Sequence, residues 1–285
     1  MDSPNRADFL KNLQPGGKYA GIIGVYRHNI SADRIGNFDS EIISALAETG
    51  VKWIAHGGAG YDQIDIPACI SKSESTLIFR FIGMIFFLGI KVTNTPGVVN
   101  DATATTALYL IISTLRKFSK AERDLRKGAW KSSLDPGQAF DVTGKTLAIL
   151  GMGGIGTRIA ELAHGFPMRV IYHNRRPAEG APAWAEYYPK EKFEEFLKEA
   201  HVLAVSVPLT QGTEGLVGET MIRGLKKGAI IINTARGKVI DEDAMIRALE
   251  DGHVCPPVIP FVLALNYLNR SLGQWAWTCI PTSQK

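Results

Sequence analysis

The sequence has 285 residues, which is enough for two medium-sized domains that each bury a hydrophobic core. Hydrophobic residues make up 45% of it and charged residues 21%, a balance that excludes a disordered or fibrous protein. A net charge of +4 gives no indication of a nucleic-acid partner, and three cysteines at unrelated spacings predict neither a disulfide framework nor a metal site. Together with a polar N-terminus that shows no signal-peptide pattern, these features lead us to expect a cytoplasmic protein.

The first hundred residues predict a smaller α/β domain over residues 1–100. We expect strands at Tyr19–Tyr26, Val51–Ala55 and Ile90–Thr93, and a helix at Asp39–Glu48. The apolar stretch Thr76–Ile90 is shorter than the roughly 20 residues that span a bilayer, and Arg80 interrupts it. We therefore expect no membrane segment and no membrane partner.

A long helix is expected next, over Ala102–Lys127, and could reach a neighbouring domain or a partner chain. Beyond it, short strands that are apolar throughout alternate with helices. The expected strands are Thr146–Leu150, Val170–His173, Val202–Val207 and Ala229–Asn233, and the expected helices are Ile155–His164, Lys192–Ala200, Glu219–Leu225 and Asp241–Glu250. Such strands are typical of a parallel sheet with both faces covered. Residues 101–254 therefore predict an α/β domain with a Rossmann-type doubly wound parallel sheet.

A glycine-rich motif, GMGGIG, joins the first of these strands to the helix that follows. It contains Gly151, Gly153, Gly154, Ile155 and Gly156. In such a motif the first glycine permits the tight turn, the second lets a pyrophosphate approach the backbone, and the last allows close helix–sheet packing. A plain tight loop is the alternative, but the strand–turn–helix context favours dinucleotide binding.

The second strand of this domain is followed by Asn174, Arg175 and Arg176. Domains that bind NAD usually carry an acidic residue about 20 residues past the glycines, where it bonds the ribose 2′-hydroxyl. Guanidinium groups instead pair with a 2′-phosphate, so the sequence favours NADP over NAD. A solvated basic turn is the alternative.

Two further loops carry candidate residues at strand ends. Arg236 follows a buried strand, where ligands bind in an open parallel sheet, although a surface arginine is the alternative. Gly58, Ala59 and Gly60 follow another strand, and their small side chains leave backbone amides open to an anion such as a carboxylate. His56 beside them could be a catalytic acid, but a single histidine near a loop is more often structural.

Six stretches occur in a fixed order: GGAGYDQIDIPAC, GIKVTNTPGVVNDATA, TLAILGMGGIGTRIA, VIYHNRRP, VSVPLTQGTEGLVG and GAIIINTARGKVIDEDAMIRALEDGHV. This set resembles the D-isomer-specific 2-hydroxyacid dehydrogenases, most closely their glyoxylate/hydroxypyruvate reductase branch. The resemblance implies a Rossmann cofactor domain, a second, smaller flavodoxin-like substrate domain, and a homodimer formed through the long linking helix. It also implies hydride transfer between NADP(H) and a small 2-keto or 2-hydroxy acid.

The same resemblance assigns roles to single residues. It implies that Arg236 binds the substrate's carboxylate and carbonyl, and that the backbone of Gly58, Ala59 and Gly60 cradles the carboxylate. The cofactor contacts that it implies are Gly153 to Gly156, Asn174, Arg175, Pro208, Thr213, Thr234 and Ala235.

The chain departs from the family pattern after Val254, where the family's G-L-D-V-Y-x-x-E-P motif and a later histidine do not occur. The codons for Trp275–Lys285 can also be read in a shifted frame, which starts at the third nucleotide of each codon. In that frame they can encode Gly-Leu-Asp-Val-Tyr-Pro-Asn-Glu-Pro-Glu, which matches the family motif. Our hypothesis is that the atypical tail 255–285 and an insertion at about 70–88 are translated introns, which sequencing of the spliced message tests. Without the family's Glu and His we expect little or no turnover, which steady-state kinetics tests.

Two other functions fit the same motifs. A non-catalytic nucleotide-binding module could control dimerisation or act like a corepressor, since fold alone does not fix function. A phosphoglycerate or formate dehydrogenase is disfavoured by the arginines that follow the second strand.

Overall fold

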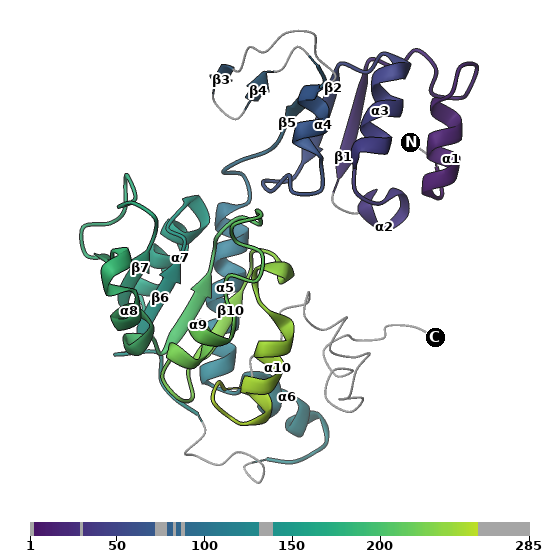
Figure 1. Ribbon diagram of the computed structural model, residues 1–285. Coiled ribbons are helices and arrows are strands. Elements are labelled where there is room, and N and C mark those ends of the chain that lie inside the picture. Colours follow the sequence, from purple (N-terminus) through teal and green to yellow (C-terminus); the bar gives the residue numbers. More distant parts are fainter. Residues whose placement is uncertain are drawn as a thin grey trace. The chain divides into compact units, whose positions relative to one another are not determined.

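The computed structural model describes residues 3–28, 31–71, 79–81, 84–86, 89–130 and 139–255, with the backbone alone given for 79–81 and 84–86. The chain divides into two compact units, Met1–Val99 and Asn100–Lys285. Figure 1 labels the elements of each unit, and each unit is described by itself.

The first unit is built on a mixed sheet with the strand order β1-β2-β5-β4-β3. Its strands are β1 (Gly24–His28), β2 (Trp53–Gly57), β3 (Phe79–Phe81), β4 (Met84–Phe86) and β5 (Lys91–Thr93), and its helices are α1 (Arg6–Leu13), α2 (Ser31–Ile35), α3 (Ser40–Thr49) and α4 (Ile66–Ser71). Strands β1, β2 and β5 run parallel, whereas β3 and β4 form an antiparallel pair beside β5. The described part of the expected insertion at 70–88 therefore comprises the end of α4 and the strands β3 and β4.

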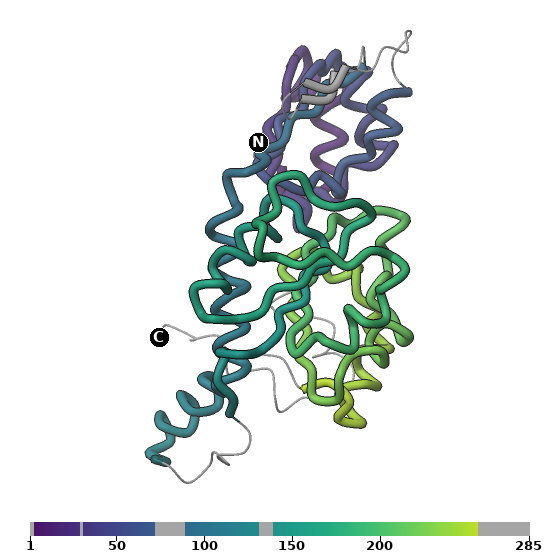
Figure 2. The backbone as a smooth tube through the Cα atoms, turned by 90° about the vertical axis from the view of Figure 1, so that its left-hand side faces the viewer, coloured from purple at the N-terminus to yellow at the C-terminus, as the bar shows by residue number. Residues whose placement is uncertain are grey.

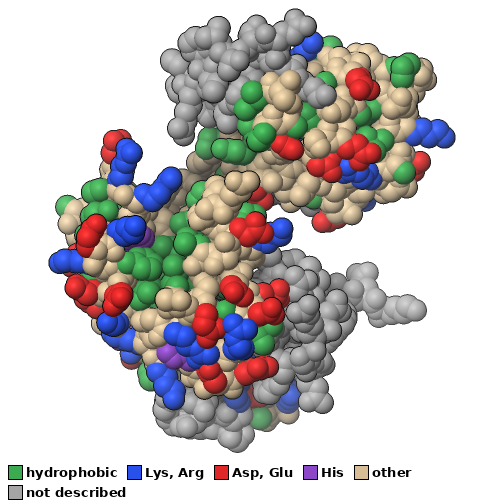
Figure 3. All heavy atoms as spheres, in the orientation of Figure 1, with side chains coloured by type: hydrophobic (Ala, Val, Ile, Leu, Met, Phe, Trp, Pro, Cys, Tyr) green, Lys and Arg blue, Asp and Glu red, His purple; other side chains and the backbone are tan. Residues whose placement is uncertain are grey.

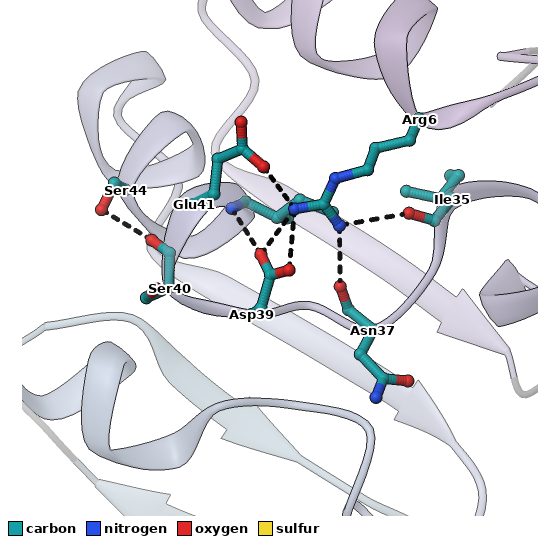
Figure 4. Close-up of polar contacts among 8 residues, drawn as sticks. Arg6, Ile35, Asn37, Asp39, Ser40, Glu41 and Ser44 are labelled. Carbon is teal, nitrogen blue, oxygen red and sulfur yellow. Dashed lines mark hydrogen bonds and ion pairs between the residues drawn. The ribbon is translucent and has the colours of Figure 1, made fainter.

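The start of α3 is fixed by a cap and an ion pair (Figure 4). Asp39 is the N-cap residue, and its side chain accepts a hydrogen bond from the amide of Ile42. The Arg6 guanidinium lies 2.8 Å from a carboxylate oxygen of Asp39 and 2.5 Å from Glu41, and it lowers the pKa of Asp39 by hydrogen bonding. Acidic groups at a helix N-terminus also interact favourably with the helix dipole. Arg6 thereby ties α1 to the first turn of α3.

Burial alternates along the strands of the first unit. Val25 of β1 and Ile54 of β2 point into a core shared with α1 and α3, whereas Tyr26 and Trp53 on the other face of the sheet are 68% and 38% exposed. The described helices of this unit therefore pack against one face of its sheet.

The second unit is built on a parallel sheet with the strand order β10-β9-β6-β7-β8. Its strands are β6 (Thr146–Leu150), β7 (Arg169–His173), β8 (Glu186–Tyr187), β9 (Val202–Val205) and β10 (Ile230–Asn233). Its helices are α5 (Asn100–Leu115), α6 (Phe118–Arg126), α7 (Gly154–His164), α8 (Phe193–Glu199), α9 (Glu219–Gly224) and α10 (Glu242–Glu250), with 3₁₀ turns η2 (Lys190–Lys192) and η3 (Gly237–Val239). The four strands and four helices predicted between residues 146 and 250 are confirmed within two residues at each end.

Helices cover both faces of the second sheet. Leu147 and Ile149 pack in one cluster with α5 and α7, whereas Ala148 and Leu150 pack in another with α8, α9 and α10. Every residue of β6 is consequently buried. The prediction of a doubly wound sheet is confirmed, and its physical basis is the unbroken apolar character of these strands.

The direction of chain progression reverses at β6. The chain runs outward from β6 to β7 and β8, then returns to the opposite side of β6 for β9 and β10. In this fold, ligands bind beyond the carboxyl ends of the strands at such a reversal. The loops that follow β6 and β9 are therefore the first place to look for a site.

The predicted long helix over Ala102–Lys127 is wrong in one respect, because it is broken in two. Helix α5 ends at Leu115, and Lys117 adopts a left-handed conformation with φ of 57° before α6 begins. Helix α6 has no buried residue and projects from the body of the second unit (Figure 2). Within the described residues, no helix is both long enough and apolar enough to span a bilayer.

Charged side chains of both signs are interspersed over α9 and α10 (Figure 3). Glu219 lies 2.7 Å from both Arg223 and Arg247 and so links the two helices. Exposed ion pairs of this kind each contribute at most about 1 kcal/mol to the unfolding free energy, which is typical of a solvated surface.

Candidate functional site

Close packing leaves little room for a side chain at three glycines of the loop after β6, and backbone atoms set that limit at Gly151 and Gly156. Gly151 has φ of +103°, and a β-carbon on it would lie 2.8 Å from the carbonyl oxygen of Ser206. A β-carbon on Gly156 would overlap the carbonyl oxygen of Gly151, and one on Gly154 would lie 2.6 Å from the side-chain nitrogen of Asn100. These positions pack the loop against β9, α5 and the start of α7.

Gly153 differs from these three glycines. Its φ and ψ of −94° and −164° suit any residue, and no heavy atom of the described structure lies within 4 Å of a β-carbon built on it. Within the described residues, the backbone amides of Gly153, Gly154, Ile155 and Gly156 also have no acceptor. Unsatisfied amides and the positive end of a helix dipole bind anions, and α7 presents both next to an open surface.

Asn174 joins the loop after β7 to the glycine loop. Its side-chain oxygen accepts a hydrogen bond of 2.7 Å from the amide of Met152, and its side-chain nitrogen lies 3.4 Å from the carbonyl oxygen of the same residue. Arg175 and Arg176 are exposed, and within the described residues neither forms an ion pair. The loop after β7 therefore carries two guanidinium groups and a carboxamide.

The loops after β9 and β10 complete this edge of the sheet. Pro208 lies early in the first loop, and its carbonyl oxygen accepts a 2.5 Å hydrogen bond from the Thr213 hydroxyl, which closes the loop. Thr234, Ala235 and Arg236 form the second loop directly after β10, which pairs with β9. All four loops thus follow the carboxyl ends of neighbouring strands.

Asn233, which the sequence analysis did not single out, shapes the loop that carries Arg236. Its side chain is 7% exposed, accepts a hydrogen bond from the amide of Ala235 (2.9 Å), and donates one to the carbonyl oxygen of Arg236 (2.8 Å). The half-buried Arg236 guanidinium donates to the carbonyl oxygen of Ala235. The signal for Asn233 was a polar residue that ends an otherwise apolar strand.

The first unit holds the predicted carboxylate cradle, Gly58–Gly60, at the end of β2. Three donors bind its carbonyl oxygens: the amide of Thr95 to Gly58 (3.1 Å), the side chain of Asn94 to Ala59 (2.7 Å) and His56 Nε2 to Gly60 (2.8 Å). Within the described residues, the amides of Gly58, Ala59 and Gly60 have no acceptor. Successive unsatisfied amides of this kind form an anion-binding nest.

His56 is not arranged as a free acid. It is 2% exposed, its Nδ1 accepts a hydrogen bond from Arg27 (3.2 Å), and its Nε2 donates to Gly60. Burial lowers the pKa of His56, so the imidazole is neutral near pH 7. Arg27 and Asn94 are not predictable from the sequence, because their partners lie on other strands and loops.

The structure gathers the predicted cofactor residues at one edge of the second sheet and the cradle at the end of β2 in the first unit. In the described part of the chain, no group of three or more His, Cys, Asp or Glu side chains is placed to hold a metal ion. Residues 256–285, where the sequence departs from the family pattern, lie outside the described residues.

Comparisons with known proteins agree on one family. The family model described as "D-isomer specific 2-hydroxyacid dehydrogenase, NAD binding domain" matches residues 108–256. The chain is 38% identical over 253 residues to 4-methyl-2-oxopentanoate reductase A of Aspergillus oryzae, and this match covers 88% of this chain and 70% of that protein. It is 36% identical over 263 residues to glyoxylate reductase 1 of Saccharomyces cerevisiae, and this match covers 89% of this chain and 68% of that protein. A crystal structure of a glyoxylate reductase from Paecilomyes thermophila matches with a TM-score of 0.76 and 39% identity, and covers 88% of this chain and 70% of that one.

Proposed function

Because the chain belongs to the D-isomer-specific 2-hydroxyacid dehydrogenases, we propose that it binds NADP(H) and a small 2-keto acid of the glyoxylate or hydroxypyruvate type. The family consists of NAD(P)-dependent oxidoreductases that act on CH–OH donors. The substrate class is supported by the similarity to proteins named glyoxylate reductase, one of them a solved structure.

The observation that carries the cofactor proposal is the open surface at Gly153. The fold does not need a glycine there, yet this position lies among four amides that lack acceptors. A pyrophosphate would satisfy those amides, and a side chain at Gly153 would obstruct its approach. The residues present therefore fit a dinucleotide, held by the amides of Gly153, Gly154 and Ile155.

Two features support NADP over NAD. The side chain that follows β7 is the carboxamide of Asn174, which would not repel a 2′-phosphate as a carboxylate does, and Arg175 and Arg176 beside it are exposed. A guanidinium group pairs with phosphate through parallel hydrogen bonds.

The nicotinamide of the bound cofactor would supply the hydride. For the chain's own residues, we assign substrate orientation to the cradle amides of Gly58, Ala59 and Gly60, which would bind the carboxylate. Arg236 would stabilise negative charge as it develops on the carbonyl oxygen. Asn233 holds the backbone on both sides of Ala235 and so keeps the Arg236 loop in one conformation.

A titration with NADPH and NADH, followed by nucleotide fluorescence, tests the cofactor proposal without requiring turnover. We expect saturable binding of both, with NADPH bound more tightly. A folded protein with no affinity for either nucleotide would overturn the proposal. That this chain shows little or no turnover remains a separate proposal, which steady-state kinetics tests.

We also propose a homodimer formed through α5 and α6. Apolar side chains are exposed along this region, where Tyr109 is 56%, Phe118 48%, Leu125 55% and Trp130 72% exposed. Helix α6 buries none of its residues within the chain. Exposed apolar groups of this kind are typical of a surface that a partner covers.

A cytoplasmic location is the remaining proposal. The two described cysteines, Cys69 and Cys255, are free thiols, as expected in a reducing compartment. Burial raises the pKa of Cys69 to about 12, which keeps it unreactive.

A further inference from the structure

The carbonyl oxygens of the cradle in the first unit accept hydrogen bonds from groups to which the proposed chemistry gives no role. The carbonyl oxygens of Gly58, Ala59 and Gly60 each accept a hydrogen bond, and the donors come from two segments, the end of β2 and the residues after β5. The carbonyl oxygen of Gly58 shares a peptide plane with the amide of Ala59, and that of Ala59 shares one with the amide of Gly60, so fixing these carbonyls fixes where two of the cradle amides point. The anchor on the Gly60 carbonyl fixes the next peptide plane, at the end of the cradle. The anchors therefore determine whether the amides can converge on one anion.

The anchor on Gly60 depends on a single tautomer of His56. Arg27 has only donors, so His56 Nδ1 must accept from it across 3.2 Å. The ring proton then lies on Nε2, from which it is donated to the Gly60 carbonyl oxygen across 2.8 Å. Arg27 thus selects the tautomer that can hold the cradle.

Arg27 is itself an unusual group to bury. It is completely buried, and its guanidinium donates to the side chain of Gln63 (2.6 Å) and lies 5.2 Å from the ring centroid of Phe38. Its Nε has no hydrogen-bond partner, and within the described residues no carboxylate forms an ion pair with it. Burial lowers the pKa of Arg27, and the charge of Asp62 opposes that shift without reversing it. A buried cation without a direct carboxylate partner is costly, so its retention calls for a role.

We propose that His56, held in its Nε2–H tautomer by Arg27, is a positioning residue for the carboxylate cradle, and that protonation of His56 displaces it by setting two cations against each other behind the cradle. The inference rests on the proposed function, since it assigns the cradle to a substrate carboxylate. A protonated His56 keeps the Nε2–H that it donates to Gly60, but its Nδ1 can no longer accept from Arg27, and the repulsion between the two cations then moves the ring and the Gly60 carbonyl that it holds.

Charge and burial around His56 support this switch. The charged groups that act on it are Arg27 from β1 and Asp62 from the loop after β2, and burial is the larger influence on its pKa, which it lowers. The neutral form thus persists into mildly acidic solution. Asn94 and Thr95, the other two anchors, do not titrate.

The test uses the full chain labelled with ¹⁵N, with oxalate as the carboxylate probe. Oxalate is titrated at several pH values, with and without NADPH, while the amide signals of Gly58, Ala59 and Gly60 are followed. We expect these three signals to shift on binding, and the affinity to fall as His56 is protonated.

Three variants separate positioning from folding. His56→Gln retains an amide donor for Gly60 but cannot be protonated, so it should bind oxalate without the pH dependence. His56→Ala should bind oxalate about 2- to 10-fold more weakly, the loss expected for one hydrogen-bond anchor. The matched control is His201→Gln in the second unit, where burial also lowers the pKa of a histidine, and it should leave the pH dependence unchanged.

Wild-type oxalate affinity in a folded His56→Ala variant would overturn the inference. So would wild-type pH dependence in His56→Gln, or the absence of any shift at the three amides in the wild type. NADPH binding is measured on the same samples. If NADPH fails to bind while oxalate binding still depends on His56, the cofactor proposal fails and the positioning role stands.

Discussion

Replacing Gly153 by alanine should separate what the glycine loop does for a ligand from what it does for the fold. The backbone there suits alanine, and a β-carbon would meet no described atom within 4 Å, so only the poorer N-cap preference of alanine should cost stability, about 1 kcal/mol or less. Nucleotide binding should suffer, because the methyl group would stand where the pyrophosphate approaches. Losing one hydrogen bond between an amide and a charged phosphate costs about 1.5–3 kcal/mol, which corresponds to roughly 10- to 150-fold in Kd.

Gly156→Ala is the matched control, because a β-carbon there overlaps the carbonyl oxygen of Gly151. Overpacking of this kind costs about 1–3 kcal/mol, and in a domain of this size each kcal/mol lowers Tm by about 2–4 °C. Thermal unfolding and NADPH fluorescence titration are run on both variants. The reasoning is refuted if Gly153→Ala lowers Tm as much as Gly156→Ala does, or if it leaves the Kd for NADPH unchanged.

Three further predictions address cofactor choice, assembly and pH. Arg175→Asp should weaken NADPH binding at least about tenfold while changing NADH binding little, and equal losses for both nucleotides would argue against a 2′-phosphate contact. Leu125→Asp on α6 should convert a dimer into a monomer in light-scattering measurements, and a dimer of unchanged stability would place the interface elsewhere. Burial lowers the pKa of both His56 and His201, so the unfolded chain takes up protons below about pH 6.5 that the folded chain does not. Denaturant titration should therefore show the unfolding free energy decreasing as pH falls below 6.5, and a flat profile would contradict the two buried neutral imidazoles.

The second unit could be predicted in detail because its strands are covered on both faces. Unbroken apolar runs such as Leu147–Leu150 stand out from the intervening helices, and the chain order of strands and helices then limits the topology to few arrangements. The break between α5 and α6 could not be foreseen in the same way. Lys117 is neither glycine nor proline, so its residue type gives no sign of the left-handed conformation that it adopts.

The candidate site was predicted unevenly for a related reason. Motif spacing identified the glycine loop and Arg236, whose neighbours in sequence are also their neighbours in space. Asn233 and Asn94 act through hydrogen bonds to backbone atoms, and Arg27 acts through a residue on the adjacent strand, 29 positions along the chain. Asn233 is marked only as a polar residue at the end of an apolar strand, and no local pattern marks Asn94 or Arg27, so the folded arrangement is needed to find their roles.

A crystal structure of the full chain with NADP would test the central claim most directly. We predict that the diphosphate accepts hydrogen bonds from the amides of Gly153, Gly154 and Ile155, with the 2′-phosphate facing Arg175. A bound nucleotide whose diphosphate lies elsewhere, with those amides turned away from it, would contradict the assignment.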